Sequence, residues 1–277
     1  MRTTVADPPP RTRAVSFSYP DGFDPAWSGD VPEFACAANS VSLMMPYVEP
    51  YIARSVRSVI DRIDDPVLRD HAVAYVRQEL SHHAQHRRFN VLIAERCPGI
   101  HTLERAMARV YGRLAARTNT GSHLAFAAGS ETVAFAAARW AAAHRRELFA
   151  TADPAAVELF VWHLAEEVEH KSVAFDVFHA MDGSRRRYIW GMVLAFALLA
   201  FFTVVGTTLQ LWHRRRLFHP VATSRLVRWA VTFLFELLPA MLVSVLPGHH
   251  PGDLADPPFL TQWLHEHDTH GAASPIG

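Results

Sequence analysis

The chain has 277 residues, with 27 basic and 27 acidic side chains and a formal net charge of zero. Its length fits one large domain or two small ones, and its 50% hydrophobic content excludes a wholly disordered chain. The balanced charge argues against a nucleic-acid-binding protein, because phosphate affinity needs a clustered basic excess. Its only cysteines, Cys36 and Cys97, cannot build a disulfide framework, which suits a reducing compartment.

Residues 1–34 are predicted to form an extended N-terminal arm on the protein surface, in part disordered. This stretch contains several prolines, starting with the run Pro8–Pro10, and several Asp and Gly residues lie between them. The arm contains no apolar run of the kind that a signal peptide requires.

Residues 35–183 show helical periodicity, and helix breakers divide them into segments of helix-hairpin length. Asp65-Pro66 and Asp153-Pro154 are typical helix starts, in which an N-cap carboxylate precedes proline. The fold class predicted from this pattern is all-α, a four-helix bundle with additional C-terminal hydrophobic helices. The expected main helices are 40–63, 66–96, 123–149 and 154–181, with a connecting helix at 101–117.

Residues 184–247 are predicted to form hydrophobic helices that associate with a membrane. No charged residue occurs between Tyr188 and Trp212, a length that could span a bilayer. A second stretch, Trp229–Pro247, is nearly as apolar. With the preceding domain in the cytoplasm, however, a simple hairpin would place the arginines of 213–228 outside, against the positive-inside tendency.

Three arrangements of these apolar helices stay open. They could lie in one leaflet as a monotopic anchor, pack on the bundle or a partner subunit, or form the buried helices of a soluble oligomer. We expect membrane association on the cytoplasmic side without committing to a span. Residues 248–277, rich in His, Pro and Gly, are predicted to form a flexible tail.

Two Glu-x-x-His motifs carry the strongest chemical signal. Glu79 and His82 lie on one predicted helix, and Glu167 and His170 lie on another. Side chains three positions apart project from the same helix face. One such motif is weak evidence in a chain with 17 histidines, whereas two on separate helices are stronger evidence. Carboxylate and imidazole ligands together suit iron or manganese, and helix-bundle di-metal proteins add one Glu from each of two further helices.

The two further carboxylates are predicted to be Glu49 and Glu131. Each is an isolated acid in apolar surroundings, where an unpaired charge would be costly. Pro46 and Pro50 bracket Glu49, so the first helix must start late or kink there and open one side of the cluster. Glu166 is an alternative ligand to Glu167, and His83 is an alternative to His82. The i, i+3 spacing selects Glu167 and His82. Glu169 is expected to face solvent.

Three motifs resemble a bacterial family of predicted metal-dependent hydrolases, whose ligand pattern is that of the ferritin-like superfamily. The resemblance covers about residues 35–215, and its motifs run over 45–51, 78–90 and 162–176. It implies the metal ligands Glu49, Glu79, His82, Glu131, Glu167 and His170. His86 and His163 match the same motifs and would be extra ligands or outer partners. An additional imidazole ligand also resembles the di-iron arylamine N-oxygenases, in which it helps to hold an oxygen intermediate.

The leading functional hypothesis is a metalloenzyme with two iron or manganese ions that activates oxygen to oxidise an apolar or lipid-like substrate. Its expected partners are O2, an electron donor and a membrane surface, with no nucleic acid and with a homo-oligomer left open. One alternative is a hydrolase in which a metal ion lowers the pKa of bound water to form hydroxide. Another is a non-catalytic, ferritin-like protein that handles iron.

Overall fold

The computed structural model describes residues 9–270, and these residues form an all-α fold, as predicted. No strand occurs among them, and the only β-type contact is an isolated bridge between Ser28 and Ala152. The α-helices are α1 (Pro32–Ser42), α2 (Met45–Arg57), α3 (Pro66–Arg96), α4 (Ile100–Arg117), α5 (Thr120–Leu148), α6 (Pro154–His170), α7 (Val173–Met181), α8 (Arg185–His213), α9 (Pro220–Ser244) and α10 (Pro258–His270), and two short 3₁₀ helices cover Ile60–Arg62 and Pro251–Asp253.

The helix starts agree with the sequence prediction where the N-cap signals are strong. The Asp65 carboxylate accepts hydrogen bonds from the backbone amides of Val67 and Leu68 and starts α3. The Asp153 carboxylate accepts from Ala155 and starts α6 in the same way. The prediction of one helix over 40–63 is wrong, because the chain breaks between Ser42 and Met45. The helix over 154–181 is also divided, into α6 and α7.

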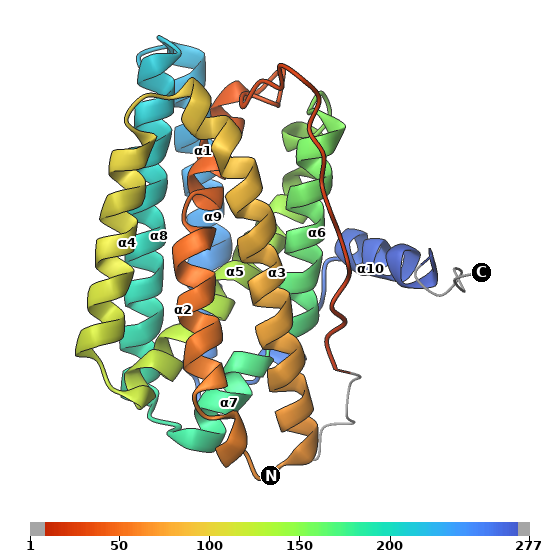
Figure 1. Ribbon diagram of the computed structural model, residues 1–277, viewed down its shortest axis with the longest axis vertical. Helices are drawn as coiled ribbons and strands as arrows, with labels where there is room; N and C mark the ends of the chain where they lie inside the picture. Colours follow the sequence, from red (N-terminus) through yellow and green to blue (C-terminus); the bar gives the residue numbers. More distant parts are fainter. Residues whose placement is uncertain (1–8, 271–277) are drawn as a thin grey trace.

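Helix α5 occupies the centre of the helical layers, and α2, α6, α7, α8 and α9 all pack against it (Figure 1). Small residues make this close packing possible. A Cβ added to Gly129 of α5 would lie 2.5 Å from the backbone of Met192, and one added to Gly191 of α8 would lie 2.4 Å from the Ala125 carbonyl oxygen. The two backbones therefore touch where α5 and α8 pack, which holds the first apolar helix firmly against the bundle.

The described part of the N-terminal arm runs as an extended segment along α3 and α6 (Figure 1). It is anchored by three buried aromatic side chains, Phe17, Phe23 and Trp27, which join the same hydrophobic cluster as Phe89 and Trp162. Residues 1–8 of the predicted arm lie outside the described residues. The anchored arm forms part of the core rather than a loose surface segment.

The prediction of a flexible tail over 248–277 is wrong for its described part. Helix α10 packs on α6, and Leu260 is buried in the contact. The Lys171 ammonium group donates to the Leu254 carbonyl oxygen at 2.7 Å and pairs with Asp256. Histidine and proline dominate the composition of this stretch and obscure its few apolar anchors. Residues 271–277 lie outside the described part of the chain.

Candidate metal centre

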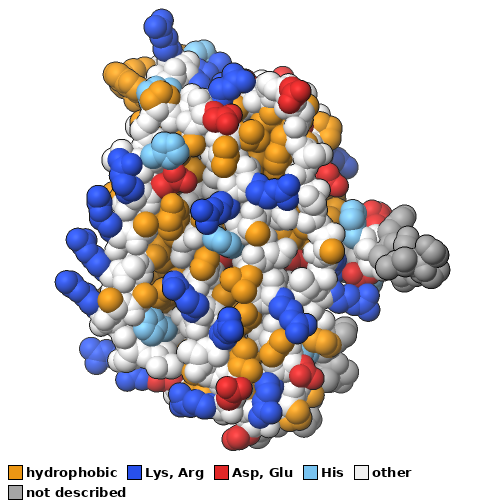
Figure 2. All heavy atoms as spheres, in the orientation of Figure 1, with side chains coloured by type: hydrophobic (Ala, Val, Ile, Leu, Met, Phe, Trp, Pro, Cys, Tyr) orange, Lys and Arg blue, Asp and Glu red, His pale blue; other side chains and the backbone are white. Residues whose placement is uncertain are grey.

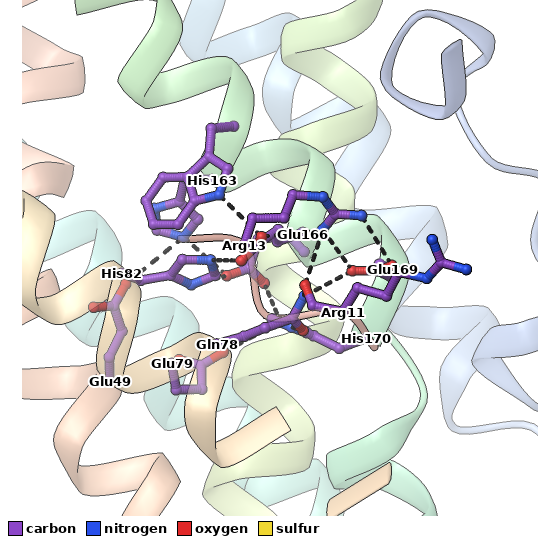
Figure 3. Close-up of polar contacts among 12 residues, drawn as sticks. Arg11, Arg13, Glu49, Gln78, Glu79, His82, His163, Glu166, Glu169 and His170 are labelled. Atoms are coloured by element: carbon purple, nitrogen blue, oxygen red, sulfur yellow. Dashed lines mark hydrogen bonds and ion pairs between the residues drawn. The ribbon is translucent and has the colours of Figure 1, made fainter. Parts of the chain in front are cut away.

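Four helices bring the predicted ligands into one buried cluster, of which Figure 3 labels Glu49, Glu79, His82 and His170. Helix α2 supplies Glu49, α5 supplies Glu131, and α3 and α6 each supply a Glu-x-x-His pair. Pro46 lies in the first turn of α2, and Pro50 lies inside that helix. Pro50 has no N–H group, so the backbone hydrogen-bond pattern is interrupted directly after Glu49. All six residues chosen from the sequence converge, and their role as metal ligands stays a prediction.

One subset of donor atoms comes from Glu49, His82 and His163, which can each place a ligand atom within 4.8 Å of the other two. The His163 Nε2 atom lies 3.7 Å from Glu49 Oε1. His163 has the most exposed side chain of the cluster, at 12%, and Glu49 is buried. This geometry includes His163 among the donors, which the sequence left open.

The second subset comes from Glu79, Glu167 and His170. The His170 Nε2 atom lies 3.2 Å from a Glu79 oxygen, 3.2 Å from a Glu131 oxygen and 3.3 Å from a Glu167 oxygen. A single imidazole nitrogen carries at most one proton, so it cannot satisfy three carboxylates by hydrogen bonding. Three carboxyl groups around one nitrogen form an arrangement that a cation would stabilise.

The polar atoms that lack hydrogen bonds support the same conclusion. Both carboxylate oxygens of Glu49 and of Glu79, Oε2 of Glu131 and Nδ1 of His82 are buried and make no hydrogen bond. A buried ionised group without a partner is strongly unfavourable, and most buried polar atoms in proteins have one. Carboxylate oxygens and imidazole nitrogens are ligands for divalent transition metals. The donor set therefore fits divalent cations.

The pKa shifts in the cluster follow from burial and crowding. Burial raises the pKa of Glu49 and Glu79 well above the ordinary value, and repulsion from Glu167 raises it further. Burial also raises the pKa of Glu131. For Glu167 burial acts in the same direction, but the contacts with His170 and His163 together outweigh it and hold the pKa well below the ordinary value. Without cations, burial thus favours the protonated form of Glu49, Glu79 and Glu131, and metal binding would displace the protons that they carry.

Outer hydrogen bonds fix which ring nitrogen of each histidine faces the cluster. The Nδ1–H group of His170 donates to the Gln78 side-chain oxygen at 2.9 Å and leaves Nε2 facing inward. The Nε2–H group of His82 donates to Glu166 at 3.0 Å and leaves Nδ1 facing inward. Metal-ligating histidines usually donate their other N–H group to such an outer partner. Glu166 is therefore an outer partner of His82 rather than a competitor of Glu167.

A hydrogen-bonded chain assigns different roles to His86 and His163. The Ser42 hydroxyl donates to the Asn90 side-chain oxygen at 2.6 Å, so its oxygen accepts from His86 Nδ1–H at 2.8 Å. The Nε2 atom of His86 is then an acceptor, and it receives the Nδ1–H group of His163 at 2.6 Å. This leaves the Nε2 lone pair of His163 facing Glu167 Oε1 at 2.9 Å. A cation between these two acceptors would satisfy both of them. His86 therefore orients His163, which is a candidate metal ligand.

Replacing His86 with Leu is expected to lower the metal content from about two ions per chain to about one. The substitution removes the acceptor that orients His163 and leaves Glu79, Glu167 and His170 unchanged. The control is His83→Leu, because His83 lies next to His82 on α3 but belongs to neither donor subset. Elemental analysis of both purified variants tests this. An unchanged metal content in His86→Leu would show that this histidine does not orient a ligand.

Arg13 of the N-terminal arm is a functional residue that the sequence did not indicate. Its guanidinium group donates to Glu166 at 3.0 Å, to Glu169 at 2.9 Å and to Asp268 of α10 at 2.9 Å. Burial disfavours the charge, but the hydrogen bonds to the two glutamates outweigh it and raise the pKa of Arg13. The expectation that Glu169 faces solvent is wrong, since Glu169 also accepts from Gln78 at 2.7 Å. Arg13 thus ties the arm and α10 to the outer partners of His82 and His170.

Replacing Arg13 with Gln is expected to weaken metal binding about tenfold without abolishing it. The change leaves the Glu166 carboxylate buried without its cation, which disturbs the group that orients His82. Arg11→Gln is the matched control in the same arm, because the Arg11 side chain is 60% exposed and its only ion pair with a described residue is with Asp268 at 3.4 Å. Competitive titration with a metal-binding dye measures both affinities, and equal affinities would contradict this role.

Comparison with known families agrees with this chemistry. Residues 11–255 match the model of a family described as predicted metal-dependent hydrolases. Neither the curated proteins nor the solved structures contain a match. The match covers the arm from Arg11 onward, the buried donor cluster and the apolar helices α8 and α9. The chain belongs to the predicted metal-dependent hydrolase family.

Proposed function

We propose that the chain is an oxidoreductase whose cluster holds two iron ions and uses O2 to oxidise an apolar substrate. The observation that carries the proposal is the donor set itself, four carboxylates and three imidazoles that are almost completely enclosed. The donors form two separate subsets, and Glu131 adds a further carboxylate beside His170. Four carboxylate charges balance two divalent cations, which makes a pair of ions the natural occupant.

Enclosure of the centre favours a small apolar co-substrate. Among the seven donors, only the side chains of Glu167 and His163 exceed 5% exposure, at 7% and 12%. Molecular oxygen needs little space to enter such a site, whereas a polar substrate and its leaving group need an open one. Paired iron ions in this position would supply electrons for the reduction of O2. The proposed reaction inserts one oxygen atom into the substrate, reduces the other to water, and takes two electrons and two protons from an external donor.

The chain's own residues position and insulate this chemistry. The Tyr75 hydroxyl donates to Glu131 Oε1 at 2.7 Å and fixes one carboxylate oxygen, which leaves the other directed toward His170. Trp162, fully buried, lies against the His82 ring and donates to Glu166. Glu167 and His163 stand on the least buried side, which is where a substrate would approach.

Hydrolysis is the second candidate, and the description of the family favours it. In that case a bound cation would lower the pKa of water to make hydroxide, and no reductant would be needed. Iron handling without catalysis would use the same donors. These alternatives differ in their need for O2 and reductant rather than in their ligands.

Oxygen consumption by iron-loaded protein with a chemical reductant and long-chain alkyl, alkenyl or arylamine probes tests the proposal. We expect sustained O2 uptake and incorporation of labelled oxygen into a probe, with Glu167→Gln inactive. Uptake that stops after one equivalent per pair of irons and leaves the probes unchanged would support iron handling instead. Ester cleavage without O2 or reductant, lost in Glu167→Gln, would support hydrolysis.

A further inference from the structure

The exposed apolar surface of the protein is concentrated on one pair of helices. Among the described residues, all but three of the exposed large hydrophobic side chains lie between Trp190 and Leu246. Both α8 and α9 are long and apolar enough to cross a membrane, yet only 28% and 17% of their most apolar windows are buried. This property alone is weak evidence, because core helices of soluble proteins can have the same length and composition.

The exposed side chains follow one face of each helix. On α8 they include Trp190, Leu194, Phe201, Val204 and Trp212, at the spacing of successive helical turns. On α9 they include Val227, Val231, Phe235, Leu238 and Leu242. The opposite faces of both helices pack on α5 and α1. The bundle therefore uses one side of each helix and leaves an exposed apolar stripe on the other side of each.

Arginines border these stripes and have no acidic partner among the described side chains. Arg185 and Arg186 precede the α8 stripe, and Arg215 follows it. On α4, which packs beside α8, Arg105, Arg109, Arg113 and Arg117 recur every four residues and are exposed. Figure 2 shows basic side chains along the edge that Figure 1 assigns to α4. The apolar faces thus have a basic border along α4 and at both ends of α8.

We propose that the outward faces of α8 and α9 dock in the plane of one leaflet of an anionic phospholipid membrane. Apolar side chains would enter the acyl region, Trp190 and Trp212 would lie at the interface, and the bordering arginines would meet lipid phosphates. A second copy of the chain is a less suitable partner for this surface. Since arginines stand at both ends of α8, parallel or antiparallel pairing of two such faces would bring like charges together.

The packing of these helices also disfavours a membrane-spanning arrangement. Helices α8 and α9 lie alongside the bundle and contact α5 and α1, and α4 contacts α8. A membrane-spanning α8 would carry the exposed arginines of α4 into the hydrocarbon region, which is strongly unfavourable. An in-plane arrangement places the same arginines at headgroup level. This inference does not depend on the proposed reaction.

The test is flotation of the full-length protein with vesicles of phosphatidylcholine alone or with 30% phosphatidylglycerol. We expect at least tenfold tighter binding to the anionic vesicles, weakened by high salt. The double variant Arg109→Glu/Arg113→Glu should lose at least tenfold in affinity, whereas Arg77→Glu/Arg87→Glu on exposed positions of α3 should not. Phe201→Ser/Phe235→Ser should also lose binding, with Leu80→Ser/Val91→Ser on α3 as its control. Unchanged thermal melting confirms that each variant is folded.

Three results would overturn the proposal. The first is no flotation of the wild-type protein, or equal binding to neutral and anionic vesicles. The second is a dimer in lipid-free buffer that Phe201→Ser/Phe235→Ser dissociates, which would show that a second copy covers this surface. The third is protection of the turn at 214–219 from protease added outside sealed vesicles, with cleavage after the vesicles are permeabilised and resistance to carbonate extraction, which would indicate a span.

Discussion

Replacing Glu167 with Gln is expected to reduce the metal content from about two ions per chain to less than half an ion. Glu167 contacts donors of both subsets, since one oxygen lies 2.9 Å from His163 Nε2 and the other lies 3.3 Å from His170 Nε2. The amide keeps the shape of the side chain but loses the charge and one acceptor oxygen. Loss of a group shared by both subsets should therefore affect both ions.

The matched control for this substitution is Glu158→Gln, the same change on the same helix. Glu158 is exposed and lies outside both donor subsets, so its replacement should leave the metal content unchanged. Elemental analysis of the two variants, with circular dichroism to confirm folding, is the measurement. Equal metal contents in the two variants would show that the inward face of α6 has been assigned incorrectly.

Metal removal is expected to lower the melting temperature by about 10 °C at pH 7.5. An ion held a thousandfold above its dissociation constant adds about 4 kcal/mol of stability, and one kcal/mol shifts the melting temperature of a protein of this size by about 2–4 °C. Dialysis against a chelator, followed by differential scanning calorimetry with and without added Fe²⁺ or Mn²⁺, gives the comparison. Equal melting temperatures would mean that no structural ion had been removed.

In the metal-free protein, Glu49, Glu79 and Glu131 should add stability as the pH falls from 8 to 6, whereas His82 and His86, whose pKa burial lowers, should act in the opposite direction. Burial raises the pKa of Glu49, Glu79 and Glu131 in the folded state, so the native protein holds protons that the unfolded chain releases. A group with a raised pKa contributes its full stability below its unfolded pKa and loses that contribution as the pH rises through the folded pKa. His170, whose pKa is raised because Glu131 and Glu167 outweigh the opposing effect of burial, changes stability in the same direction.

Relative to the metal-free protein, the metal-loaded protein should lose stability as the pH falls, because protons compete with the cations for the same donors. The difference in melting temperature between the two forms should therefore narrow as the pH falls. Calorimetry at three pH values measures this difference. A gap that widens toward low pH would show that the carboxyl groups of the metal-free cluster are not held protonated.

The sequence predicted which side chains converge, because the information that fixes their positions is local. The i, i+3 spacing of Glu79 with His82 and of Glu167 with His170 fixes which helix face each pair occupies, whatever the rest of the chain does. Glu49 and Glu131 could be chosen because each is the only acid in a long apolar stretch. The strongest helix starts, at Asp65 and Asp153, were predicted for the same reason, since an N-cap acts within one turn.

Contacts between distant segments could not be predicted in this way. Arg13 is 153 residues from Glu166, and nothing in the proline-rich arm distinguishes it from neighbouring arginines. The helix α10 was missed because its anchoring contacts, including Leu260 against α6, exist only after the fold has formed. The roles of His86 and His163 depended on the hydroxyl of Ser42, which lies in a different helix.

The central claim is that the cluster holds two metal ions, and anomalous X-ray scattering at the iron edge tests it most directly. Crystals of protein produced with added iron are expected to give two anomalous peaks per chain. One peak should lie among Glu49, His82 and His163, and the other among Glu79, Glu167 and His170. The account would be contradicted if crystals of iron-replete protein gave no peak in this cluster, or a single peak located elsewhere.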